Sequence, residues 1–236
     1  FFTAFGISNW RILAIFWALI PIVNAIFFTQ VPIYSLQEEG EKGLTLKELC
    51  RNKVFWLMMI MMVCSGASEQ AVSQWASTFA EQGLGVSKTV GDLAGPLAFA
   101  ALMGTSRLLY GKFGDKLNLN KCMVSACLCV ISYLCIALIP VPAIGLIGCA
   151  LCGFSVGVLW PGTFSKSSAA IKRGGTVMFA MLALAGDLGC SGGPTLAGLV
   201  SGNFNNNLHI GILSAIIFPA IMLLCLLISK YKLSKS

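Results

Sequence analysis

The chain has 236 residues, of which 57% are hydrophobic and only 11% are charged, and its mean hydropathy is +0.84. Soluble globular domains carry about 25% charged residues, so this composition excludes a water-soluble fold. The formal charge of +7 does not indicate nucleic-acid binding, because the basic residues are spread between apolar segments instead of forming one patch. Ten cysteines lie mostly inside apolar runs, which predicts helix packing and not a disulfide scaffold.

Seven segments are long and apolar enough to cross a hydrocarbon core about 30 Å thick, which takes about 20 helical residues. They are apolar on all sides and do not alternate, which favours helices over a barrel. We therefore expect an all-α polytopic membrane protein. The expected spans are residues 10–28, 54–80, 90–110, 122–139, 143–164, 176–200 and 210–229.

The loops between these spans predict the orientation of the chain. Most Lys and Arg residues fall in alternate loops counted from residue 35, whereas the opposite loops hold only Arg11 and Lys88. Because cytoplasmic loops are enriched in Lys and Arg, we expect a cytoplasmic C-terminus. The low charge of the opposite loops and their lack of glycosylation sequons fit a bacterial inner membrane. The start at Phe1, without Met or a basic leader, predicts that the chain is a fragment.

The most specific local motif is the sequence GKFGDK at 111–116, on the short turn expected after the third span. It resembles the loop signature of the major facilitator superfamily, G-x-x-x-D-[RK]-x-G-[RK]-[RK], although residues 117–121 lack the second part of that pattern. The resemblance implies a gating motif formed by Arg107, Gly111, Asp115 and Lys116. The alternative interpretation is a simple polar turn that orients the chain.

The same resemblance implies the domain organisation. Residues 1–34 would end an N-terminal half, residues 35–53 would form the cytoplasmic central loop, and residues 54–236 would form the C-terminal six-helix bundle. The rest of the N-terminal half would be missing from this chain. Four further stretches, at 69–76, 91–96, 153–161 and 185–187, together resemble the fucose, galactose and glucose permeases, which carry sugar with a coupling cation.

Polar residues within the second span predict a solute-binding wall. Glu69 lies inside the span, and Gln70 and Gln74 form an adjacent stripe with Trp75 beyond them. Amides can bond sugar hydroxyls and an indole can stack on the sugar ring, and Trp160 of the fifth span is a second candidate for stacking. Alternatively, the amides act as structural glue between helices and Trp160 is an interfacial anchor.

Two membrane carboxylates are candidates for ion coupling, because ionisable groups inside a bilayer are costly and mark transport pathways. Glu69 or Asp187 could take up and release a proton, or could bind sodium, during transport. The rival hypothesis for Asp187 is a permanent ion pair, with Arg107 as one possible partner.

Together with these residues, the resemblance implies a secondary active transporter that moves a small polar solute, a sugar, across the lipid bilayer by alternating access, coupled to a cation gradient. The alternatives are a transporter of a non-sugar solute and a non-transporting or truncated relative. We expect no enzymatic activity, because the nearest polar constellation, Asp92 with Glu81 or Lys88, lacks a His or Cys partner. We expect no cofactor and no metal site, since His209 stands alone and no phosphate-binding loop is present.

Overall fold

The computed structural model describes residues 9–32, 43–113 and 119–233, and the regular structure in these ranges is helical. The chain divides into two compact units, Phe1–Glu41 and Lys42–Ser236. In the first unit, helix α1 (Trp10–Phe28) begins at Asn9, whose side chain accepts a hydrogen bond from the backbone N–H of Arg11 at 3.1 Å.

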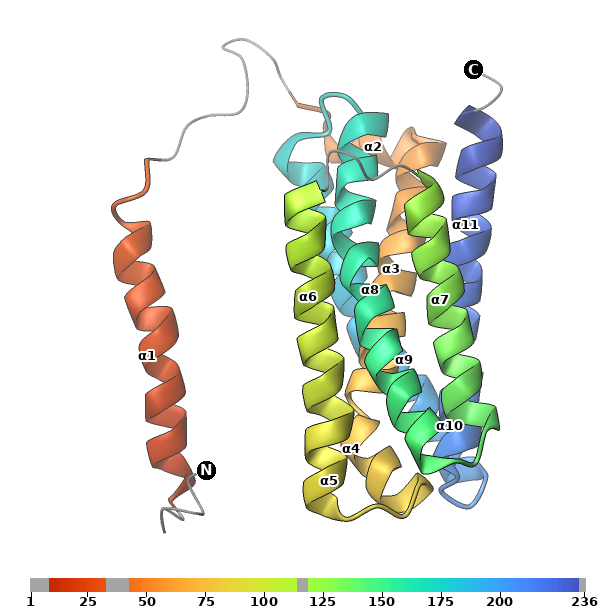
Figure 1. The fold of residues 1–236 in the computed structure, drawn as a ribbon. Helices are drawn as coiled ribbons and strands as arrows, with labels where there is room; N and C mark the ends of the chain where they lie inside the picture. The colour runs from red at the N-terminus through yellow and green to blue at the C-terminus, as the bar shows by residue number, and fades with distance from the viewer. Residues whose placement is uncertain (1–8, 33–42, 114–118, 234–236) are drawn as a thin grey trace. The chain divides into compact units, whose positions relative to one another are not determined.

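The second unit is a helical bundle, with α2 at one end and α4, α5 and α10 at the other (Figure 1). Two π-helical segments, η2 (Phe79–Gly83) and η3 (Leu93–Leu97), continue α4 and α5. The α-helices of this unit are α2 (Leu46–Arg51), α3 (Lys53–Ser73), α4 (Ala76–Thr78), α5 (Lys88–Asp92), α6 (Ala98–Phe113), α7 (Leu119–Leu138), α8 (Pro142–Ala170), α9 (Gly175–Asn203), α10 (Leu208–Ser214) and α11 (Ile217–Leu233).

The all-α polytopic membrane fold is confirmed, and the expected count of seven spans is approximate. Among the described residues, the expected third span is helical but carries Asp92 and Arg107, which make it less apolar than the others. Five helical segments are long and apolar enough to cross a membrane, and Cys122–Leu138 is a shorter apolar helix. The five are Arg11–Phe28, Lys53–Gly83, Pro142–Ala170, Gly175–Asn203 and Leu208–Lys230.

The second expected span is not one continuous α-helix. α3 ends at Ser73, and the chain turns at Gln74 and Trp75 before α4 begins. η3 packs beside this break, because a Cβ added to Gly95 would lie 3.1 Å from the carbonyl oxygen of Ala76. Two irregular stretches of neighbouring helices therefore contact each other.

Glycines bring two pairs of helices into close contact. In the α6–α8 pair, a Cβ on Gly157 would lie 2.8 Å from the Cβ of Ser106, and one on Gly153 would lie 2.9 Å from the Cα and the carbonyl carbon of Phe99. In the α3–α9 pair, a Cβ on Gly189 would lie 2.8 Å from the carbonyl carbon of Val63. The small-xxx-small spacing within α8 and α9 predicts this close approach of helix backbones, and the structure confirms it.

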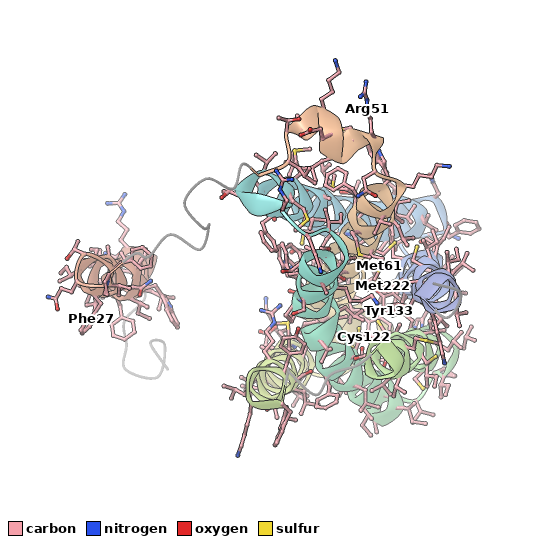
Figure 2. All side chains as sticks on the ribbon, turned by 90° about the horizontal axis from the view of Figure 1, so that it is seen from above. Phe27, Arg51, Met61, Cys122, Tyr133 and Met222 are labelled. Carbon is pink, nitrogen blue, oxygen red and sulfur yellow. The ribbon has the colours of Figure 1, made fainter. Side chains whose placement is uncertain are left out.

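The core of the bundle is apolar, with one buried tyrosine that is hydrogen-bonded. Figure 2, seen along the bundle, places Met61, Tyr133 and Met222 in its interior, and all three are at most 1% exposed. The hydroxyl of Tyr133 donates to the backbone carbonyl of Ser68 at 2.8 Å, which ties α7 to α3. A buried phenol needs such a partner, because an unpaired polar group in an apolar core costs free energy.

The α2 end of the bundle is held by local capping. Thr45 and Glu48 form a capping box at the start of α2, and Leu49 is fully buried beneath the helix. The backbone N–H of Leu44 donates to the carbonyl of Arg173, in the turn between α8 and α9, at 2.8 Å. This hydrogen bond holds the residues just before α2 against the turn between α8 and α9.

Candidate functional site

A cavity of about 460 Å³ lies where α3, α6, α8 and α9 meet. Each of these helices contributes at least one lining residue, so the packing of all four determines its shape. The residues that line it are Glu69, Arg107, Tyr110, Trp160, Pro161 and Cys190. Cavities of a few hundred Å³ are typical of sites for small molecules.

An ion pair between two helices forms one wall of the cavity. Nη2 of Arg107, on α6, donates to Oε2 of Glu69, on α3, at 3.0 Å. The side chain of Glu69 is 12% exposed, whereas that of Arg107 is 46% exposed. The carboxylate is therefore largely enclosed by protein, while the guanidinium is open to whatever enters the cavity.

Aromatic side chains from α6 and α8 also line the cavity. The indole of Trp160 reaches across to α9, where a Cβ added to Gly186 would lie within 3 Å of ring carbon atoms. The hydroxyl of Tyr110 donates to the carbonyl oxygen of Pro161 at 3.2 Å and lies 2.5 Å from the hydroxyl oxygen of Ser165. The site thus combines a carboxylate, a guanidinium, a phenol and an indole, which suits recognition of a small polar molecule with an apolar face.

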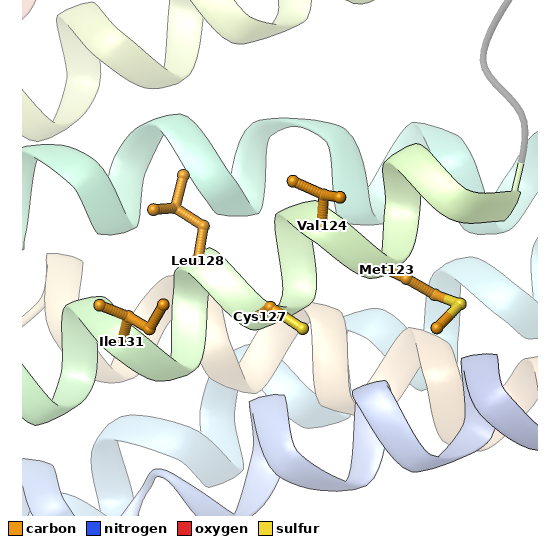
Figure 3. Close-up of a pocket in the computed structure, with 5 residues that line it drawn as sticks. All are labelled: Met123, Val124, Cys127, Leu128 and Ile131. Atoms are coloured by element: carbon orange, nitrogen blue, oxygen red, sulfur yellow. The ribbon is translucent and has the colours of Figure 1, made fainter.

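A second hollow, of about 440 Å³, lies along α7 and is entirely apolar. Figure 3 shows its lining residues, Met123, Val124, Cys127, Leu128 and Ile131, on this one helix. Val124 is 68% exposed, so the hollow is an open surface groove. It offers neither charge nor hydrogen-bonding groups for a polar solute, and we assign no site to it.

The structure brings together three residues that the sequence singles out, namely Glu69, Arg107 and Trp160. It does not bring Gln70, Gln74 or Trp75 into this cavity. The side chain of Gln74 is exposed at the break after α3. Trp75 turns toward α9, where its Nε1 donates to the carbonyl oxygen of Pro194 at 3.0 Å. Gln70 lies in the regular part of α3, one residue after Glu69 and therefore about 100° around the helix from it, and Gln74 and Trp75 follow where α3 ends.

The remaining expected residues lie elsewhere. Asp187 is exposed on α9 and does not line the cavity, and the ion pair of Arg107 is with Glu69 instead of Asp187. Gly111 is exposed at the end of α6, and a Cβ there would meet no described atom within 4 Å, so no described neighbour requires glycine. Asp115 and Lys116 lie outside the described residues.

Three lining residues were not predicted from the sequence: Tyr110, Pro161 and Cys190. Tyr110 lies three residues after Arg107 on α6, so helical spacing could have placed it on the same face. Pro161 is adjacent to Trp160. Cys190, in contrast, carries no signal in the sequence that separates it from the packing cysteines.

Comparison with known families identifies the class of this protein. The family model of the Major Facilitator Superfamily matches residues 1–194, and the chain belongs to that family. It is therefore an integral, multi-pass membrane transporter of a small-molecule solute, and members of this family are transporters and not enzymes. No curated protein and no solved structure matches the chain.

Proposed function

We propose that this protein is a secondary active transporter that moves a sugar by alternating access and is driven by a proton gradient. The observation that carries the proposal is the ion pair of Glu69 and Arg107, which opens into a cavity lined by Trp160 and Tyr110. A titratable carboxylate beside a solute-sized cavity allows proton binding and solute binding to influence each other.

The aromatic wall supports the sugar assignment. Trp160 presents a flat apolar surface, which suits the C–H face of a pyranose ring, and Tyr110 and Arg107 supply hydrogen-bonding groups for hydroxyls. This combination replaces the wall of Gln70, Gln74 and Trp75 expected from the sequence.

Arg107 favours a proton over sodium as the coupling ion. Its guanidinium already provides a positive charge 3.0 Å from the carboxylate of Glu69, so a sodium ion at that carboxylate would face a like charge at short range. A proton adds no bulk and neutralises Glu69, which removes its attraction for Arg107. We therefore propose Glu69 as the coupling acid and assign no coupling role to Asp187, which is exposed outside the cavity.

The topology remains part of the proposal. We propose that residues 1–34 end an N-terminal half and that residues 35–53 form the cytoplasmic central loop. The protein lies in a bacterial inner membrane with its C-terminus in the cytoplasm. The N-terminal half of the same protein supplies the second wall of the solute site.

The test uses the whole protein in sealed liposomes with a pH-sensitive dye in the external medium and a panel of sugars added one at a time. The proposal expects one or more sugars to alkalinise the medium as protons enter with the sugar. Glu69→Gln should abolish uphill accumulation but retain exchange of labelled sugar for unlabelled sugar, because exchange needs no net proton movement. Asp187→Asn is the control and should retain both activities. Failure of every sugar, with folded and inserted protein, would refute the sugar assignment.

A further inference from the structure

We infer that the solute carries a carboxylate, that is, that the sugar is a sugar acid, and that Arg107 binds this group while Glu69 is protonated. The inference rests on the proposed function and narrows its substrate class. Three features of the cavity support it: the unused donors of Arg107, the charge balance of the pair, and the position of the aromatic wall.

Arg107 is only partly used by Glu69. A guanidinium has five N–H donors, and the bond to Glu69 runs from Nη2 to Oε2 alone at 3.0 Å. The side chain is 46% exposed where it borders the cavity. A planar guanidinium with free donors binds a carboxylate through two parallel hydrogen bonds, which a neutral hydroxyl cannot match.

The charges that line the cavity also favour a solute with a carboxylate. Among the described residues, Glu69 and Arg107 are the charged residues that line it, and together they are neutral, while Asp187 is exposed one turn before the lining residue Cys190. A proton bound to Glu69 leaves the guanidinium of Arg107 as the charged group in the cavity lining, where it can attract an anion. A solute carboxylate restores neutrality, so a proton and an anionic solute each improve the binding of the other.

The other lining groups favour a hydroxylated ring over a simple organic acid. Trp160 and Tyr110 lie on the same cavity as Arg107, so a carboxylate on Arg107 leaves the rest of the solute beside an indole and a phenol. A hexuronate meets both demands, because it has a carboxylate at one end of a pyranose ring.

The experiment compares matched pairs that differ only at C6, namely glucose with glucuronate and galactose with galacturonate. Labelled uptake into liposomes containing the whole protein is measured at an imposed inward proton gradient, with the membrane potential set by potassium and valinomycin. We expect at least one acid to be taken up with about tenfold or higher kcat/KM than its neutral partner. A proton with a monoanion carries no net charge, so this uptake should not respond to the potential.

Variants at Arg107 test whether this residue causes the preference for the acid over the neutral sugar. Arg107→Gln should reduce the ratio of acid to neutral uptake to about one, Arg107→Lys should retain part of it, and Lys172→Gln, which removes an exposed charge outside the cavity, should leave it unchanged. If a neutral sugar is taken up as well as its acid and responds to an inside-negative potential, the carboxylate inference is overturned and the proposed function stands. An acid preference that survives Arg107→Gln also overturns the inference. Uptake of neither member of any pair refutes the sugar assignment and this inference together.

Discussion

The indole N–H of Trp75 donates a hydrogen bond to the backbone carbonyl oxygen of Pro194, with 3.0 Å between Nε1 and the oxygen. The same ring packs over α9 one turn further along, because a Cβ added to Gly198 would lie 2.8 Å from Cζ2 of the indole. Trp75 therefore fixes the break after α3 to the neighbouring helix, which is a structural role and not a solute contact.

This role predicts opposite effects for two tryptophans. Trp75→Phe keeps an aromatic ring but removes the hydrogen bond, and should lower the free energy of unfolding by about 1 kcal/mol. It should leave the KM for solute unchanged, whereas Trp160→Phe should raise that KM because Trp160 lines the cavity. Thermal unfolding in detergent and uptake in liposomes measure the two effects. A raised KM for Trp75→Phe would contradict the assignment.

Two glycines of α9 form a matched pair for testing the close contact with α3. Gly189→Ala places a Cβ 2.8 Å from the carbonyl carbon of Val63, and should destabilise the protein by about 1–3 kcal/mol because neither backbone can yield. Gly192→Ala places its Cβ where no atom lies within 4 Å, and should be neutral or slightly stabilising. Equal unfolding temperatures for the two variants would refute this account of the interface.

The capping box of α2 predicts a local dependence on pH. The backbone N–H and hydroxyl of Thr45 both donate to Oε2 of Glu48 at 2.8 Å, and these bonds lower the pKa of Glu48 below its ordinary value of 4.5. The ionised form therefore stabilises α2 fully above pH 4.5, and this contribution is lost as the pH falls through the lowered pKa. After correction for the intrinsic pH dependence of exchange, the protection of the amides of residues 46–51 should fall over that range.

The control for this pH dependence is Glu48→Gln, which has no carboxylate to titrate in the box. In that variant the same amides should exchange at a rate that, after correction for intrinsic chemistry, does not change with pH. Persistence of the acid-induced loosening in Glu48→Gln would assign it to another group.

His209 predicts a second local effect, at the opposite end of the bundle. Its Nε2 lies 3.2 Å from the carbonyl oxygen of Gly83 and its Nδ1 lies 3.3 Å from that of Ala137, while its ring meets Phe79 edge to face. His209→Phe retains a ring against Phe79 but removes the polar contacts, and should cost about 1 kcal/mol. Faster hydrogen exchange at the end of η2, with no change at α2, is the expected result; uniform loosening would contradict it.

The sequence predicts the parts of this fold that depend on local chemistry. Long apolar runs identify the membrane helices, and the spacing of Gly153 with Gly157 and of Gly189 with Gly193 identifies where helices approach closely. The presence of Glu69 within a span marks it as a candidate functional residue, since a carboxylate there is costly. Each of these signals lies in a short stretch of chain.

The rest of the site depends on how helices are rotated and where they are interrupted. Residues 74 and 75 contain neither Pro nor Gly, so nothing in the sequence marks the end of α3 or the contact of Trp75 with α9. The partner of Arg107 could equally have been Asp187, because pairing across 38 residues is decided by the mutual rotation of α3 and α6. Tertiary packing determines both outcomes.

The glycine contacts described above show which helices the ion pair of Glu69 and Arg107 connects. α3 and α9 approach each other backbone to backbone, and so do α6 and α8. Glu69 belongs to the first pair of helices and Arg107 to the second, and their hydrogen bond links the two pairs. Loss of the charge on either residue would therefore remove an attraction that links the α3–α9 pair to the α6–α8 pair.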